Sequence, residues 1–446
     1  MHLFVSLVLI IIMNKRLASA LIGVAFVSAM FAQSGTNSPY SQYGLGLMSD
    51  QTSGFNRGMN GLGLGFRESN QVNFINPASY SSIDSLSFIF DVGLSGQITN
   101  FKENGVRKNA RNGNFEYAVA AFRAFRHVGV SFGLVPFTNV GYDYSHSDYV
   151  DNSMTTKYTN SYSGTGGLHQ AYVGIGAQPF KGFSVGVNVS YLWGDITRTI
   201  TNAYSDAYIN SMTKSYEANV RNYKLDFGAQ YSLNVTKKDV LTIGATYGLG
   251  HKLNADAKCD ITLQNTQSSV STTTSMVAEN ALELPTMIGA GFSVNHNNRL
   301  KIGADYQLQK WGDVGFPVYQ VQNNVAQYVV TDNYFSDRHK VTIGGEWSRN
   351  PLSRRWLDRV KVRLGCSYAT SYLKINGNDG PKEMSVSAGF GIPFSNAINS
   401  YMVRPILNIS GQWVRQSADG LLRENTFRLN IGLTFNERWF AKWKVD

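Results

Sequence analysis

Glycines near the N-terminus are spaced as Gly61-x-Gly63-x-Gly65, which resembles part of a nucleotide-binding loop. Such a loop binds phosphate when it follows a strand, opens a helix and contains a third glycine at the correct spacing. This segment meets none of these conditions. The glycines instead predict a segment that bends and packs closely, so no nucleotide or other cofactor is expected.

Histidine and cysteine form no recognisable site in the sequence. The seven histidines are scattered, with no pair at the spacing of metal ligands. Cys366 alternates with Leu364 and Tyr368 on an apolar face, and Cys259 is expected to be a free thiol in a loop. No nucleophile, base and oxyanion group are indicated together. We therefore expect that the protein is not an enzyme and binds no metal.

The clearest charged feature is a group of arginines late in the chain, Arg349, Arg354, Arg355 and Arg359, in a protein whose formal net charge is +10. Such a cluster could bind nucleic acid, anionic lipid headgroups or an acidic protein. The choice among these ligands depends on the compartment in which the cluster lies.

Composition indicates which surroundings the surface has. Charged residues make up 16% of the chain, against about 25% in typical soluble domains, whereas 43% of the residues are hydrophobic. The surface is therefore short of charge without being short of apolar groups. This balance predicts a β-rich protein whose outer face does not meet water.

Period-two alternation runs along most of the chain. In residues 86–99, for example, Phe88 and Phe90 alternate with Ser87 and Asp91, as a strand between an apolar and a polar medium requires. Most of these segments are long enough to cross a bilayer, which takes about 9–11 residues. Fourteen can be counted: residues 86–99, 114–125, 128–144, 168–178, 183–198, 216–234, 239–254, 282–295, 299–311, 335–348, 359–374, 382–392, 402–415 and 424–437.

The connections between these segments alternate between long and mostly short. The two-residue turn Arg126-His127 follows the second segment, whereas residues 145–167 follow the third. Long outside loops and short periplasmic turns are typical of a transmembrane antiparallel β-barrel in the outer membrane of a Gram-negative bacterium. The arginine cluster then faces the periplasm, where nucleic acid is not expected. Anionic headgroups, or an acidic periplasmic partner for which the cluster is a docking patch, remain as hypotheses.

Strand parity also assigns side chains to the two faces of the barrel. Those expected to face the lumen are mixed in charge, which suits a lumen filled by a hydrogen-bonded plug: Lys224, Asp226, Asp305, Lys361, Arg363 and Arg428. Aromatic residues at strand ends are expected to form interface girdles: Tyr142, Tyr144, Tyr191, Trp193, Trp311, Trp347, Trp439 and Trp443.

The N-terminus has the pattern of a secretory signal peptide, residues 1–32, with Met13 interpreted as the true start. From there, Lys15 and Arg16 form the charged region, an apolar run follows, and cleavage is expected after Ala32 or Ala29. Removing residues 1–32 takes away two cations and no acid, so the net charge falls from +10 to +8.

Residues 33–85 do not follow the strand pattern and are expected to form a plug, whereas residues 86–446 form the barrel. The plug carries Arg57-Gly58-Met59-Asn60-Gly61 and, further on, Asn76-Pro77-Ala78. These motifs resemble the N-terminal hatch of the FadL-type outer-membrane transporters of hydrophobic compounds. Fourteen strands is also that family's number. Asn436 to Phe440 after the last strand resembles a form common in members from Bacteroidota.

The resemblance implies two functions from different classes. The first is transport of small hydrophobic molecules, such as long-chain fatty acids, through a plugged barrel. The alternative is a non-transporting barrel that serves as a subunit of an outer-membrane secretion or assembly complex. The partners expected are outer-membrane lipid and lipopolysaccharide, with a hydrophobic ligand in the first case and protein subunits in the second.

Overall fold

The computed structural model describes residues 35–85, 87–150, 154–393 and 405–438. The predicted signal peptide, Trp439, Trp443 and the start of the predicted strand 402–415 lie outside these residues. Within the described part of the chain, no helix is long and apolar enough to span a membrane.

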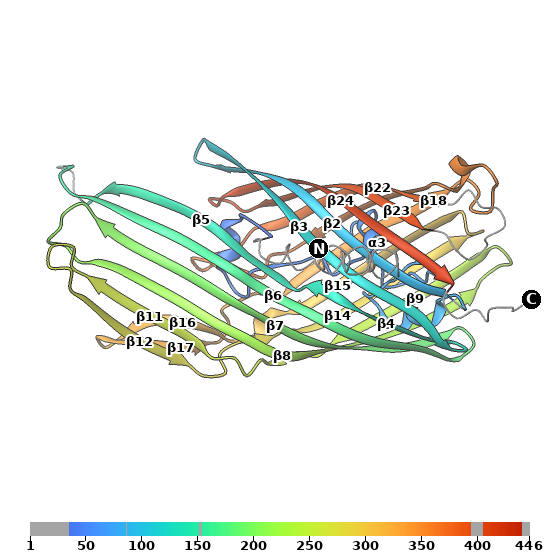
Figure 1. Cartoon of the computed structure of the whole chain (residues 1–446), viewed down its shortest axis with the longest axis horizontal. Coiled ribbons are helices and arrows are strands. Elements are labelled where there is room, and N and C mark those ends of the chain that lie inside the picture. The colour runs from blue at the N-terminus through green and yellow to red at the C-terminus, as the bar shows by residue number, and fades with distance from the viewer. Residues whose placement is uncertain (1–34, 86, 151–153, 394–404, 439–446) are drawn as a thin grey trace, which may run out of the picture.

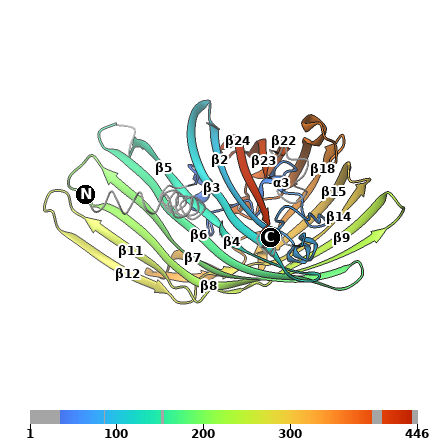
Figure 2. The same ribbon diagram turned by 45° about the vertical axis from the view of Figure 1, so that its right-hand side comes forward.

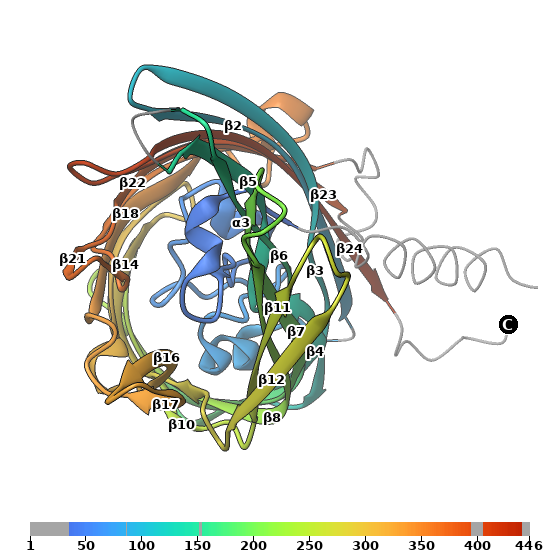
Figure 3. The ribbon, with the colours of Figure 1, turned by 90° about the vertical axis from the view of Figure 1, so that its left-hand side faces the viewer.

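Among the described residues, fourteen antiparallel crossings form a barrel, as the alternation predicted (Figures 1 and 3). The ring closes where β2 pairs with β24, from Ser87 with Arg438 to Lys102 with Arg423. The wall strands are β2 (Ser87–Glu103), β3 (Val106–Phe125), β4 (Val128–Pro136) with β5 (Thr138–Tyr149), β6 (Lys157–Phe180), β7 (Phe183–Tyr204), β8 (Ser211–Asn234), β9 (Asp239–Gly248), β14 (Thr286–His296), β15 (Leu300–Lys310), β18 (Arg338–Ser348), β19 (Lys361–Ala369), β22 (Lys382–Pro393), β23 (Ile406–Ser417) and β24 (Arg423–Arg438).

β2 shows how alternation separates the two faces of the wall. Ile89 and Asp91 are fully buried inside the barrel. Phe90, Leu94 and Ile98 lie on the outer face and are 40%, 40% and 48% exposed. A band of exposed apolar side chains is stable against lipid, not against water. The outer face of the barrel is therefore the membrane surface.

Several strands extend well beyond the length that a bilayer requires. β6, β7 and β8 contain 24, 22 and 24 residues, against about 10 for a bilayer crossing. The predicted loop 255–281 contains a further hairpin, β11 (Ala257–Gln264) and β12 (Ser271–Ala278), which continues the sheet beside β8. The predicted loop 312–334 contains the hairpin β16 (Phe316–Gln322) and β17 (Val325–Thr331).

The predicted strand 128–144 is interrupted at Phe137, because the proline at 136 ends one ladder and the chain bends inward. β3 pairs with β4 from Ala118 onward, whereas β5 pairs with β6 and not with the rest of β3. A wedge therefore opens in the wall between β3 and β5 (Figure 1). It is occupied by the plug segment β1 (Leu47–Met48), which pairs with the start of β5.

The described part of the plug, residues 35–85, lies inside the ring of strands (Figures 2 and 3). It contains the 3-10 helix η1 (Pro39–Gln42), β1, the short helix α3 (Gly54–Arg57) and the 3-10 helix η2 (Pro77–Ser82). Proline begins both 3-10 helices, and Ser38 and Asn76 cap their N-termini with side-chain oxygens.

Candidate functional site

Arg57 lies at the centre of the plug and is 4% exposed. Its Nη2 lies 2.9 Å from Glu116 Oε2 on β3. Its Nε donates to Thr52 O at 3.1 Å, and its Nη2 also donates to Asp50 O at 3.1 Å. Arg57 therefore joins the plug to the wall and holds the loop that precedes α3.

The plug lies against wall backbone at several points where the contact requires glycine. A methyl group on Gly58 would lie 3.0 Å from Arg363 Cδ, and Gly61 has a φ of 88°. From the wall side, a methyl group on Gly365 would overlap the backbone of Met59, and one on Gly186 would overlap that of Pro77. The wall glycines thus permit backbone-to-backbone packing, whereas Gly58 leaves room for a wall side chain and Gly61 permits a left-handed turn.

The Asn76-Pro77-Ala78 turn is seated against the opposite wall. Asn76 Nδ2 donates to Leu64 O at 3.0 Å within the plug and to Ala229 O on β8 at 3.2 Å. Asn76 Oδ1 accepts from the backbone nitrogen of Ala78 at 3.2 Å, which starts η2. The asparagine therefore fixes both the local turn and its place on the wall.

The wall residues predicted to face the lumen take part in separate interactions. Asp305 on β15 accepts hydrogen bonds from the backbone nitrogens of Gly63 and Leu64, at 2.7 and 2.9 Å. The plug backbone at Gly63 and Leu64 thus binds a wall carboxylate. Lys224 and Asp226 on β8 form an ion pair with each other and line a cavity.

A buried ion cluster joins the plug to three wall strands. Glu346 on β18 lies 2.9 Å from Lys361 Nζ and 2.7 Å from Arg363 Nε. Lys301 on β15 pairs with Glu68 of the plug and lies 3.7 Å from Glu346. The cluster therefore combines two carboxylates with three cations, all with side chains less than 20% exposed. Within the plug and wall that the structure describes, it is the largest group of ion pairs.

Neither acid of this cluster was predicted from the sequence. Glu346 stands at an inward position between Ile343 and Trp347, whose side chains are about half exposed on the outer face, so strand parity could have identified it. Glu68 lies in irregular plug chain, where no periodicity assigns direction.

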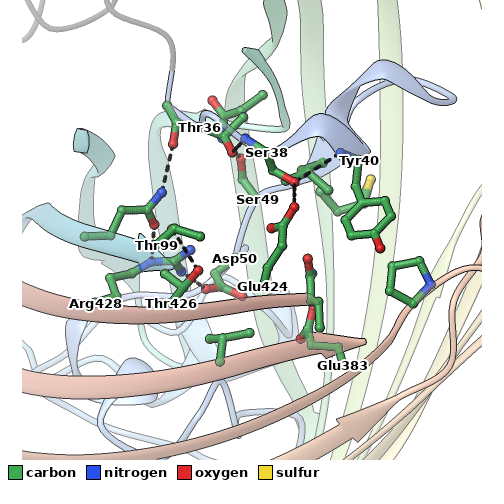
Figure 4. A pocket seen from close by; sticks show the side chains of 18 of the residues that line it. Thr36, Ser38, Tyr40, Ser49, Asp50, Thr99, Glu383, Glu424, Thr426 and Arg428 are labelled. Carbon is green, nitrogen blue, oxygen red and sulfur yellow. Dashed lines mark hydrogen bonds and ion pairs between the residues drawn. The ribbon is translucent and has the colours of Figure 1, made fainter. Parts of the chain in front are cut away.

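A second ion pair lies on another side of the plug. Arg428 Nη1 on β24 lies 2.7 Å from Asp50 Oδ2, and the two side chains point toward one another in Figure 4. Burial, the largest single effect, would raise the pKa of Asp50, but the surrounding cations together outweigh it and the pKa falls to about 2. Arg428 contributes most to this lowering, followed by Lys340, Arg57 and Arg338. Asp50 is therefore ionised at neutral pH and holds the plug by charge.

An aromatic layer covers the plug on the side of the long loops. Trp311 is fully buried and stacks on Tyr372 with ring centroids 4.6 Å apart. Phe335 lies 5.5 Å from Trp311 and 5.4 Å from Phe316. Tyr372 also donates from its hydroxyl to Gly46 O at 2.6 Å, which links this lid to the plug.

The girdle prediction was therefore wrong for Trp311, which folds into the lumen in a 3-10 turn after β15. It was also wrong for Tyr142, which is buried because β5 bends inward. Trp347 and Tyr191 are 50% and 53% exposed on the outer wall.

The described part of the lumen retains cavities of about 140 and 180 Å³. Both are lined by charged side chains, among them Asp50, Arg338 and Glu383 (Figure 4). Pockets for drug-sized ligands typically measure about 300–1,000 Å³ and are mostly apolar. These cavities are small and polar by comparison.

The arginine cluster lies in the turn between β18 and β19. Arg349, Arg354 and Arg355 are exposed, and Arg349 Nη1 lies 3.4 Å from Asp358 Oδ1. Arg359 ends the 3-10 helix η4 (Trp356–Arg359) and is half-buried. The turn lies among the short connections, at the end of the barrel that parity assigns to the periplasm.

Catalytic and metal chemistry find no support in the described residues. No group of three or more His, Cys, Asp or Glu side chains there could hold a metal ion. Gly182-x-Ser184-x-Gly186 has the spacing of a nucleophile elbow, but it lies where β7 begins in the wall. Ser184 Oγ is bound at 2.7 Å by Arg67 Nη1 and at 3.0 Å by Ser81 Oγ, so it is a packing residue.

Solved structures with the same fold include toluene transporters. The toluene transporter TbuX of Ralstonia pickettii is 14% identical, with a TM-score of 0.58 over 87% of this chain and 99% of that one. The toluene transporter TodX of Pseudomonas putida is 16% identical, with a TM-score of 0.58 over 88% and 100% of the two chains. A FadL homologue of Pseudomonas aeruginosa is 14% identical, with a TM-score of 0.58 over 87% and 98%. At this identity the likeness shows the fold alone.

No curated protein matches the sequence significantly. The family model described as BamG matches residues 13–446. The barrel is a non-enzymatic protein of the outer membrane. Its fold is that of the FadL-like barrels, and by the extent of this match the chain belongs to the BamG family.

Proposed function

We propose that this protein is a non-transporting barrel subunit of the outer-membrane complex that assembles β-barrel proteins. The observation that carries the proposal is the closed lumen, with an ion-paired plug beneath an aromatic lid. Membership of the BamG family supports the assembly complex as the partner.

Opening the lumen to a passing molecule would require free energy at both the plug and the aromatic lid. Passage of a molecule along the lumen would have to displace the plug from the Glu346 cluster, and breaking a buried ion pair costs about 3–5 kcal/mol. It would also have to part the lid at Trp311 and Tyr372. The cavities left beside the plug are lined by charges, which an apolar solute would have to desolvate.

The wedge in the wall is closed as well. Leu47 and Met48 pair with Asn139 and Thr138 at the edge of β5. Ser41 Oγ accepts a hydrogen bond from the backbone nitrogen of Gly141 at 3.1 Å, which extends the contact between plug and wall further along β5. Lateral exit toward lipid thus meets hydrogen-bonded plug chain.

Transport of small hydrophobic molecules, the other hypothesis, draws support from the fold alone. The solved transporters that share the fold are 14–16% identical to this chain. A fold shared at this level hosts different functions, so the contents of the lumen must decide.

Affinity purification tests the proposal. A tag inserted at the exposed β2–β3 turn, between Asn104 and Gly105, leaves the periplasmic turns and the plug intact. We expect the tagged protein, extracted in mild detergent, to co-purify in fixed proportion with the central assembly barrel. A tagged barrel of similar abundance from the same membrane is the control.

Depletion of the protein should also lower the folded amount of other outer-membrane barrels. Uptake of a labelled fatty acid should not change. Isolation of the barrel alone, together with uptake that requires it, would overturn the proposal in favour of transport.

A further inference from the structure

The β18–β19 turn, residues 349–360, combines cations with exposed apolar side chains. Leu352 and Leu357 are 79% and 74% exposed, and Trp356 is 41% exposed. Arg354 and Arg355 are exposed between the two leucines. Apolar groups projecting this far from a folded surface indicate contact with something other than water.

Hydrogen bonds hold the turn in this shape. The backbone nitrogen of Asn350 donates to Asp358 O at 2.9 Å, and Ser353 Oγ donates to Asp358 Oδ2 at 2.9 Å. Trp356 Nε1 donates to Pro393 O at 2.8 Å, at the end of β22. The leucines therefore project from an ordered turn that is anchored to the neighbouring strand.

The turn lies beside the membrane surface of the barrel. It begins two residues after Trp347, which is 50% exposed on the outer wall. In Figure 3 the turn projects outside the ring of strands, and in Figure 1 it lies near the end where the short connections gather. This is the level at which the headgroups of the inner leaflet surround an outer-membrane barrel.

Charge selects the ligand. Asp358 is the one acid of the turn, and among the described residues no carboxylate forms an ion pair with Arg354 or Arg355. Other turns on this rim repeat the combination, because Phe125 is 75% exposed before Arg126 and Phe180 is 72% exposed before Lys181. A combination repeated around the rim fits lipid, which surrounds the barrel, better than a partner docked at one place.

We propose that the β18–β19 turn is a binding site for anionic phospholipid of the inner leaflet. Arg349, Arg354 and Arg355 bind the phosphate groups, as guanidinium does well. Leu352 and Leu357 enter the boundary of the acyl chains, with Trp356 at the headgroup level. This site does not depend on the assembly function proposed above.

Native mass spectrometry of the purified full-length barrel, titrated with phosphatidylglycerol and separately with phosphatidylethanolamine, tests the site. Each arginine near an anionic surface is expected to contribute about fivefold in affinity, so the triple glutamine variant should lose about 100-fold for phosphatidylglycerol. The variant carries R349Q, R354Q and R355Q. A matched control removes the same charge at the opposite end of the barrel, with R107Q, K108Q and R111Q, and should bind like the wild type.

Two further readouts keep the result decisive. Unheated gel mobility establishes that each variant is a folded barrel. Brominated phosphatidylglycerol should quench Trp356 as well as the outer-wall Trp347, so W356F should show less quenching than the wild type, and the triple glutamine variant should show the same decrease.

Equal loss of phosphatidylglycerol binding in both triple variants, or no loss in either, would overturn the proposal. The proposal would also be overturned if the triple glutamine variant kept its lipid but lost a co-purifying acidic periplasmic protein, because the turn would then be a protein-docking site. Failure of the co-purification test above would leave the lipid result unaffected.

Discussion

Replacing Glu346 by glutamine tests whether the ion cluster holds the plug. Glu346 is 4% exposed and is the carboxylate nearest to Lys361 and Arg363. The substitution conserves shape but leaves three buried cations facing one remaining acid, Glu68. Removing one partner of a buried pair typically costs about 3–5 kcal/mol, because the other charge stays buried without compensation.

The assay is the free energy of unfolding in urea, followed by tryptophan fluorescence of the barrel in detergent. A matched control is K258Q, which breaks the pair between Lys258 and Asp260 on the exposed hairpin, where the lysine side chain is 47% exposed. Exposed pairs contribute about 0–1 kcal/mol, so K258Q should unfold almost like the wild type.

A double substitution separates the pair from the loss of one charge. E346Q combined with R363M removes both partners of the 2.7 Å contact and should recover part of the stability that E346Q loses. An E346Q variant whose unfolding free energy lies within about 1 kcal/mol of that of K258Q, the range for exposed pairs, would refute the proposed role of the cluster. Additive effects of E346Q and R363M would likewise show that the two side chains do not act as a pair.

Other substitutions probe the plug, its charge and the outer hairpin. G365A should destabilise the barrel by about 1–3 kcal/mol, because the added methyl group overlaps plug backbone. G96A, which has open space around the added methyl group, should change the unfolding free energy by less than about 0.5 kcal/mol. Urea unfolding measures both changes. The pKa of Asp50 is about 2 against an ordinary 3.8, so the stabilisation from its charge is complete above pH 4 and is lost as the pH falls through 2. D50N should remove this part of the pH dependence of the unfolding free energy. A wild type that loses stability in acid in the same way as D50N does would contradict the lowered pKa of Asp50. Burial raises the pKa of the Cys259 thiol, so a water-soluble maleimide should modify it only after denaturation, as mass spectrometry would record; rapid labelling of the folded barrel would contradict this packing.

The sequence predicts the wall better than it predicts what fills the wall. Alternation in residues 86–99 places Asp91 and Phe90 on opposite faces because the two faces meet different media, and that pattern is written locally. Trp311 ends the predicted strand 299–311, but the chain leaves the wall at that residue and its side chain points inward with the turn. Direction beyond a strand end is set by loop packing, which periodicity does not encode.

Ion pairs across the lumen are harder still to predict from a sequence pattern. Lys361 and Arg363 can be placed inward by parity, but their ion pairs involve Glu68 and Glu346, which come from different parts of the chain. The β11–β12 hairpin was missed for another reason: its Thr-rich edge strand has polar side chains on both faces, so it shows no alternation.

The seam between β2 and β24 also fixes the order in which the molecule is completed. The plug precedes the first wall strand, and Ser38 donates to Glu424, 386 residues later in the chain. Contacts over such separations form only after the last strand has arrived, and closing so long a loop is slow. The contacts that hold the plug therefore come from both ends of the chain, and the plug is fully fixed only once the seam has formed.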